Sequence, residues 1–214
     1  MRLQAMITTN KGQGLWLSVD GCEGAGKTTL VGRLQEKFPS LITVPEFSST
    51  HVGKWLEKEV LTKPYTLSPS RLSDALLFLS DYFGMVASIV QPALRENRIV
   101  ISDRGFLSKI AVQTAILEED HGDKAQEMLM QLFSLTRRPD FSAVLNTPLP
   151  EIRKRIIARC GSCDEERYAM IQRTEALMRR YAELCALPHQ FLSAEDAEQT
   201  LTSIITHHLN GGCL

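Results

Sequence analysis

The segment from Gly21 to Thr29 reads GCEGAGKTT and has the residue types of a loop that binds phosphate. The glycines of the pattern G-x-x-x-x-G-K-T let consecutive main-chain amides turn toward one anion. The side chain of Lys27 would reach the β- and γ-phosphates of a nucleoside triphosphate, and the hydroxyl of Thr28 would bind Mg²⁺. The residues that we assign to nucleotide binding are Gly21, Glu23, Gly24, Ala25, Gly26, Lys27, Thr28 and Thr29.

A second pair of chemically competent residues ends the apolar run IVISDR, where Asp103 is followed by Arg104. Ligands of parallel sheets bind at the carboxyl ends of strands, so we expect Asp103 to lie at the Mg²⁺ or its water shell. The guanidinium of Arg104 offers two parallel hydrogen bonds to a phosphate that is being transferred or is accepting. The simpler interpretations are a turn carboxylate for Asp103 and a surface cation for Arg104.

A basic segment, 153–159, leads into the irregular sequence CGSCDEE at 160–166. Arg155 and Arg159 are four residues apart and share one face of a helix, which suits a lid over a triphosphate between about 153 and 167. A solvated basic face is the alternative. Cys160 and Cys163 have no second Cys or His pair at zinc-binding spacing, so we interpret them as incidental.

The elements that must position these residues alternate along the chain. Apolar runs of strand length, rich in Val, Ile and Leu, are separated by segments with helical periodicity, and this predicts an α/β fold with a parallel sheet covered by helices on both faces. No repeat or linker divides the sequence, so we expect one domain over 1–214. The predicted strands are 15–20, 41–46, 99–103, 142–147 and 190–193.

Composition limits the possible partners. The chain has 24 basic and 25 acidic residues, and this balance predicts neither nucleic-acid nor membrane binding. The N-terminus does not resemble a signal peptide, and we find no run near the ~20 apolar residues that span a bilayer. We therefore expect a cytoplasmic protein that acts on small molecules.

A phosphate loop alone does not separate GTPases, ATPases and small-molecule kinases. The segments around it do more, because their order and spacing resemble bacterial thymidylate kinases from about Leu15 to the C-terminal helix. The segments that carry the resemblance are GCEGAGKTT, ALLFLSDY (75–82), QPAL (91–94), IVISDR (99–104), LSKIAVQ (107–113), RPDFSAVLNTPLPEIRKRIIAR (138–159), RTEALMRRYAEL and FLSAED.

The resemblance implies a three-layer P-loop kinase fold with a five-stranded parallel sheet, ATP as donor, Mg²⁺ as cofactor and a homodimer. It places Glu23 near the acceptor sugar, Phe78 against the acceptor base and Gln113 near that base. Matched to the family's pattern, the catalytic residues are Lys27, Arg104, Arg155 and Arg159, and the acceptor-binding residues are Glu23, Glu46, Phe78, Arg104 and Gln113.

The sequence departs from the family at the acceptor's phosphate. The family usually has arginines where this chain has Pro45 and Tyr82, and Tyr or His where it has Gly105. Of three expected arginines only Arg104 remains, and each charge-assisted hydrogen bond that is lost is worth roughly 1.5–3 kcal/mol. The candidate cations to substitute for the two missing arginines are Arg71, His51 and Lys54.

We predict ATP-dependent phosphoryl transfer to a pyrimidine deoxynucleoside monophosphate. The first alternative is a kinase of a nucleoside or another hydroxyl-bearing metabolite, with Glu46 as the general base. The second is a nucleotide-binding regulator or ATPase that turns over no acceptor.

Overall fold

The computed structural model describes residues 13–62 and 67–211. Within these ranges one five-stranded sheet has the order β2-β3-β1-β4-β5, and each neighbouring pair is parallel. In the central strand, Leu17 lies opposite Ile101 on one side and Phe141 on the other. The strands are β1 (Leu15–Asp20), β2 (Ile42–Val44), β3 (Ile99–Asp103), β4 (Phe141–Leu145) and β5 (His189–Leu192).

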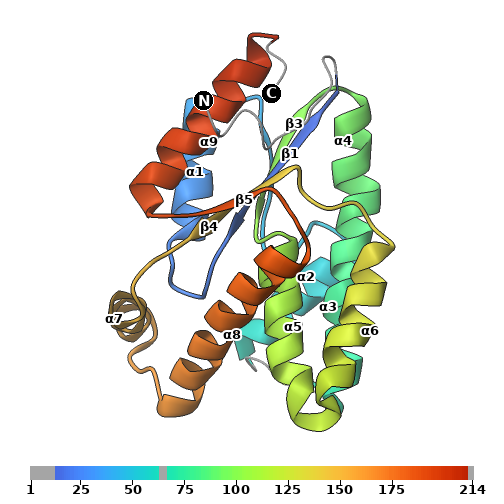
Figure 1. Ribbon diagram of the computed structural model, residues 1–214, viewed down its shortest axis with the longest axis vertical. Coiled ribbons are helices and arrows are strands. Elements are labelled where there is room, and N and C mark those ends of the chain that lie inside the picture. The colour runs from blue at the N-terminus through green and yellow to red at the C-terminus, as the bar shows by residue number, and fades with distance from the viewer. Residues whose placement is uncertain (1–12, 63–66, 212–214) are drawn as a thin grey trace.

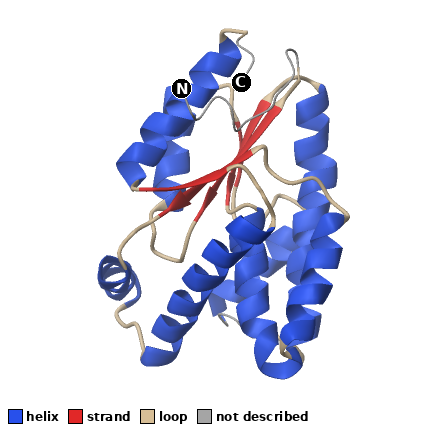
Figure 2. Cartoon of the chain, viewed as in Figure 1, coloured by secondary structure: helices blue, strands red, loops and turns tan. Residues whose placement is uncertain are grey.

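Helices cover both faces of the sheet (Figures 1 and 2). On one face lie α1 and α9, and on the other lie α3, α4, α5, α6 and α8, whereas α7 stands apart from the sheet (Figure 1). The helices are α1 (Lys27–Lys37), α2 (His51–Thr62), α3 (Arg71–Met85), α4 (Gln91–Arg95), α5 (Phe106–His121), α6 (Asp123–Ser134), α7 (Leu149–Cys160), α8 (Glu165–Leu184) and α9 (Ala194–Leu209). The predicted sheet with helices on both faces is confirmed.

Strand positions follow the sequence closely. The predicted ranges for β1 and β3 match the structure, and those for β4 and β5 differ by one or two residues at an end. The second strand is shorter than predicted because Pro45 follows Val44, and proline has no N–H with which to continue a ladder.

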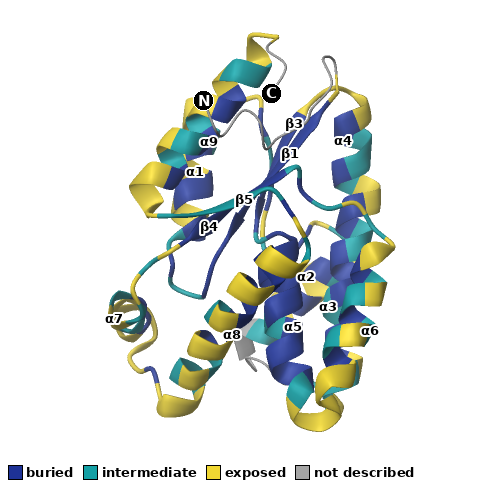
Figure 3. Cartoon of the chain, viewed as in Figure 1, coloured by how far each residue is buried: buried dark blue, intermediate teal, exposed yellow. Residues whose placement is uncertain are grey.

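Each face of the sheet packs against its own apolar cluster. Leu30 and Leu34 of α1 pack with Leu201 of α9 against one face, and Tyr82 and Phe133 belong to the cluster on the other. All residues of β1 and β3 are buried, which accounts for their continuous apolar sequences (Figure 3). The ends of these two strands are therefore fixed by both clusters.

The segment from Arg71 to Arg95 is one long helical path in which a π-helical turn, Val86–Val90, joins α3 to α4. It is the one helix among the described residues that is long and apolar enough, by length and composition, to cross a membrane. From the sequence we expected no run near the ~20 apolar residues that span a bilayer, and this helix passes that test by length and composition. Its residues Leu79, Tyr82 and Val90 are buried in the main cluster, as in the core helix of a folded domain.

Candidate active site

The phosphate loop connects the end of β1 to the start of α1. Gly21, Gly24 and Gly26 have φ angles of 142°, 76° and 102°, which L side chains rarely adopt. The glycines of the motif are therefore needed for the path of the loop. The Nζ of Lys27 donates a hydrogen bond of 2.7 Å to the carbonyl oxygen of Cys22, so the loop curls around the lysine.

The ammonium of Lys27 is buried, with 6% of the residue exposed. Burial, followed by the nearby charge of Arg104, lowers its pKa to about 8, although Glu46 and Asp103 act in the opposite direction. A bound phosphate would supply the negative charge that holds the proton on this lysine.

The carboxylate of Asp103 lies beside the loop at the end of β3. One of its oxygens, Oδ2, accepts a hydrogen bond of 2.5 Å from the hydroxyl of Thr28. The other, Oδ1, is buried and has no hydrogen-bond partner among the described residues. An unsatisfied carboxylate oxygen beside a hydroxyl is a donor set that suits Mg²⁺, which binds proteins through few oxygens and keeps several waters. In the described ranges no group of three or more His, Cys, Asp or Glu side chains forms a metal site.

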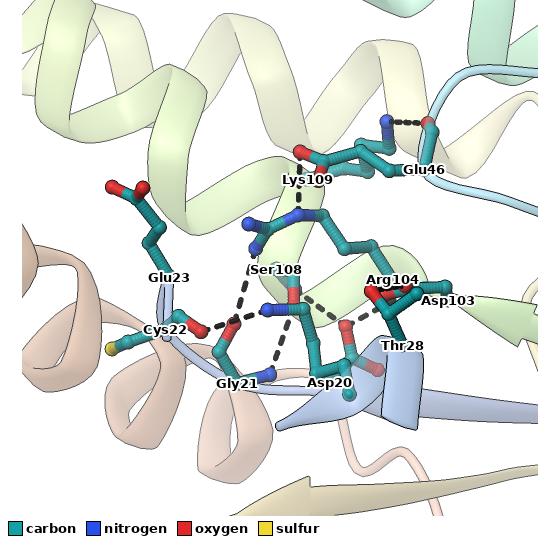
Figure 4. A network of polar contacts seen from close by, with 12 residues as sticks. Asp20, Gly21, Cys22, Glu23, Thr28, Glu46, Asp103, Arg104, Ser108 and Lys109 are labelled. Atoms are coloured by element: carbon teal, nitrogen blue, oxygen red, sulfur yellow. Dashed lines mark hydrogen bonds and ion pairs between the residues drawn. The ribbon is translucent and has the colours of Figure 1, made fainter. Parts of the chain in front are cut away.

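Arg104 follows Asp103 in a strained conformation, with a φ angle of 73°. Its main-chain N–H donates to the carbonyl of Val19, and its guanidinium reaches the carbonyl of Gly21 at 3.1 Å. On its other side, Nε forms an ion pair of 2.6 Å with Glu46, which follows β2 (Figure 4). Arg104 therefore bridges the ends of three neighbouring strands.

The carboxylate of Glu46 stays ionised because of its cationic neighbours. Burial would raise the pKa of Glu46, but Arg104, Lys109 and Lys27 together bring it down to about 2.

Asp20, at the end of β1, joins the phosphate loop to α5. Its Oδ1 accepts hydrogen bonds from the main-chain N–H groups of Ser108 (Figure 4) and Gly105. Its Oδ2 accepts one from the hydroxyl of Ser18. The hydroxyl oxygen of Ser108 accepts in turn from the N–H of Gly21. A Cβ at position 105 would lie 2.5 Å from the Cβ of Ser18, so this packing explains why Tyr or His is absent there.

A cavity of about 940 Å³ joins the phosphate loop to an aromatic end. At that end Phe47 and Phe78 have ring centroids 6.2 Å apart, and Gln113 is buried with its Oε1 unpaired among the described residues. Gly21 and Asp103 lie outside the lining. The site residues that the sequence predicted and that line the cavity are Glu23, Gly24, Ala25, Gly26, Lys27, Thr28, Thr29, Glu46, Phe78, Arg104, Gln113, Arg155 and Arg159.

The basic segment of α7 and the start of α8 contact the phosphate loop. Glu23 forms ion pairs with Arg159 and Arg167. Arg155 donates to the carbonyls of Gly24 and Ala25, each at 3.3 Å. Glu23 was expected near an acceptor sugar, and here its carboxylate lies between two arginines of the predicted lid.

Among the cavity residues that were not selected from the sequence are one aromatic and two cationic side chains: Phe47, Lys109 and Arg167. Phe47 stands in a segment where the family that the sequence resembles usually has paired glycines, and Lys109 has the appearance of an ordinary polar position on a helix. The Nζ of Lys109 donates a 2.7 Å hydrogen bond to the carbonyl of Glu46 and lies 5.6 Å from the ring centroid of Phe47. Burial lowers the pKa of Lys109.

Comparisons with known proteins agree in one family. The profile of the family described as thymidylate kinase matches residues 19–206. A probable thymidylate kinase from Thermococcus onnurineus is 29% identical over 209 residues, which cover 91% of this chain and 98% of the relative. One from Pyrobaculum aerophilum is 31% identical over 170 residues, 78% of this chain and 83% of the relative.

Solved structures share the fold. The thymidylate kinase of Ehrlichia chaffeensis superposes with a TM-score of 0.65 at 18% identity and covers 90% of this chain and 99% of that one. The Candida albicans thymidylate kinase gives 0.66 at 18% identity and covers 95% of each chain. This likeness confirms the predicted P-loop kinase fold.

Proposed function

The chain belongs to the thymidylate kinase family, and we propose that it transfers the γ-phosphoryl group of ATP to the phosphate of dTMP. It is a P-loop nucleotide kinase, a phosphotransferase. The observation that carries the proposal is the cavity, which joins the phosphate loop to a pair of phenylalanines and a buried amide, with Arg104 lying between. A donor triphosphate and a nucleoside monophosphate need such a continuous space if the attacking and leaving oxygens are to lie in line with the transferred phosphorus.

On the donor side, the main-chain amides of the loop and the ammonium of Lys27 hold the β- and γ-phosphates. Arg155 and Arg159 approach from the lid, and Arg104 approaches from β3, so that positive charge surrounds the transferred group. Phosphoryl transfer needs little covalent help from a protein, and its rate depends on positioning and on this neutralisation.

Thr28 and Asp103 would hold Mg²⁺. The support is the unsatisfied Oδ1 of Asp103 beside the hydroxyl of Thr28. When bound, the ion would add charge neutralisation at the phosphate oxygens.

On the acceptor side, Phe78 and Phe47 offer ring faces to a planar base. The buried Oε1 of Gln113 has no partner among the described residues, and an N–H at the edge of a pyrimidine would satisfy it. Glu23 and Glu46 lie at the same cavity as anions held by arginines. They orient those arginines toward the reacting phosphates.

A kinase of hydroxyl groups fits this site less well. Such an enzyme uses a carboxylate to take the proton of the hydroxyl, and an efficient base has a pKa near the working pH. The pKa of Glu46 lies at about 2 because of the cations around it. An acceptor that already carries a phosphate needs no base.

We further propose one kinase domain over 1–214, with a lid at about 153–167 that closes on ATP. A homodimer and a cytoplasmic location complete the proposal. The nearly equal numbers of basic and acidic residues, 24 and 25, support a small nucleotide as partner and give no support to nucleic acid or membrane.

The test is ADP release in a coupled assay with a panel of nucleosides and monophosphates. We expect turnover with dTMP and none with thymidine, and a loss of at least about 100-fold in Lys27→Ala. Turnover with unphosphorylated acceptors alone would favour the hydroxyl kinase. ADP release that no acceptor changes would favour a regulator or ATPase.

A further inference from the structure

The acceptor half of the cavity contains a second buried lysine besides Lys27. Lys109 is on the second turn of α5, only 8% of it is exposed, and it lines the cavity together with Arg104 and Phe47. A buried ammonium is costly unless its hydrogen bonds and its charge are satisfied. Among the described residues its Nζ donates only to the carbonyl of Glu46, so a group with three donor hydrogens retains capacity for a ligand.

Glu46 holds the two cations of this region together. Its carboxylate pairs with Nε of Arg104, and its main-chain carbonyl accepts from Lys109 (Figure 4). Asp81 and Asp103 also act on the charge of Lys109, but neither lines the cavity, whereas Arg104 and Lys109 both do. The cavity wall here therefore presents two cations beside the one carboxylate of Glu46, an arrangement that suits an anionic ligand.

The other cations that could take this role lie elsewhere. Arg71 is bound to Glu119 and Asp120. His51 and Lys54 are exposed residues of α2 outside the cavity lining. Tyr82, where an arginine was expected, is buried among aromatic rings of the main cluster, 5.2 Å from Phe133 between centroids.

We propose that Lys109 binds the phosphate of the acceptor together with Arg104 and so replaces the missing arginines. The inference rests on the proposed function, because it assigns a charge to the phosphate that dTMP has and thymidine lacks. A lysine recognises phosphate as a point charge, without the two-pronged geometry of arginine. Lys109 therefore determines whether a monophosphate is preferred to its nucleoside.

The test removes the lysine from the protein and, separately, the phosphate from the ligand. Binding of dTMP and of thymidine is measured by calorimetry for the wild-type protein and Lys109→Met. We expect dTMP to bind about 10- to 100-fold more weakly to the variant, the effect of one charge-assisted hydrogen bond. Thymidine and ATP should bind within about twofold of wild type, because neither places a phosphate at this position.

Three further variants complete the design. Lys109→Arg should keep most of the preference for dTMP, since it keeps the charge. Lys54→Met removes an exposed lysine outside the cavity and should change nothing. Lys109→Gln, with thermal unfolding of each variant, replaces Lys109→Met if the apolar side chain prevents folding.

Two results would overturn the inference while leaving the proposed function intact. In the first, Lys109→Met binds dTMP as tightly as wild type. In the second, Lys109→Met binds dTMP and thymidine more weakly by the same factor, which would mean that the lysine only holds the loop at Glu46. A wild-type protein that does not distinguish dTMP from thymidine would overturn both the inference and the proposed function.

Discussion

The depressed pKa of Lys27 makes ATP binding depend on pH. In the free protein burial brings this pKa from 10.5 to about 8, and the phosphates of ATP restore the protonated form. If the pKa of Lys27 returns to about 10.5 in the ATP complex, the dissociation constant of ATP rises above its neutral-pH value by about 2-fold at pH 8 and about 10-fold at pH 9. Binding at pH 8 should take up about half a proton.

The measurement is calorimetry of Mg-ATP binding between pH 6.5 and 9.5, in two buffers that differ in ionisation enthalpy. Lys27→Arg is the matched control, because a guanidinium keeps its charge over the whole range. The variant should lose the pH dependence and the proton uptake. The reasoning is wrong if the wild type binds ATP equally well at pH 7 and pH 9, or if the ATP affinity of Lys27→Arg still falls as pH rises.

The same pKa predicts the stability of the protein without nucleotide. Between pH 8 and 10.5 the unfolded chain retains a proton on Lys27 that the folded protein has lost. Since the unfolded state binds more protons, this lysine makes the free energy of unfolding rise with pH across that window. Lys27→Met should remove this contribution, which urea titrations at pH 7 and pH 10 would measure.

Three further predictions concern the rest of the site. Asp103→Asn keeps an oxygen for the hydroxyl of Thr28 but loses the negative charge, so the Mg²⁺ concentration for half-maximal rate should rise by about 10-fold or more; an unchanged Mg²⁺ titration would contradict the metal assignment. Tyr82→Arg places a charge in the aromatic cluster, and a cost of about 3–5 kcal/mol should lower the melting temperature by roughly 6–20 °C without improving the KM for dTMP. Tyr82→Phe is its control, and a better KM in the arginine variant would place position 82 at the acceptor after all. Arg167→Met removes one partner of Glu23 and should raise the KM for ATP about 5-fold, the effect of about 1 kcal/mol. Its control is Arg180→Met, which lies outside the cavity lining and should leave the KM for ATP unaltered.

The phosphate loop and the strands beside it could be predicted because their signals are local. The chain must turn at the glycines of GCEGAGKTT, and the continuous apolar runs of β1 and β3 require burial on both faces. Their order in the sheet brings Asp103 beside Thr28, the neighbourhood in which the sequence predicts Mg²⁺ from the position of the strand end.

The acceptor half could not be predicted in the same way, because it depends on how helices pack. Lys109 follows Ser108, and the hydrogen bonds of Ser108 to Asp20 and Gly21 tie the start of α5 to the end of β1, an arrangement in which Lys109 lines the cavity. Tyr82 illustrates the opposite case, since its alignment with an arginine suggested a ligand position and the packing of α3 places it in the core.

The close contact of Gly105 with Ser18 gives substitutions at this site an obligatory order. A side chain at position 105 would meet the Cβ and Oγ of Ser18 at 2.5 Å and the Oδ2 of Asp20 at 2.9 Å. Ser18→Gly would remove the two contacts at 2.5 Å, but the Oδ2 of Asp20 would remain 2.9 Å away, on a carboxylate that also accepts from the main-chain N–H groups of Gly105 and Ser108. A side chain at position 105 therefore requires Ser18 to change first and the carboxylate of Asp20 to move with it, a dependence of one position on another that an engineer of this site must follow.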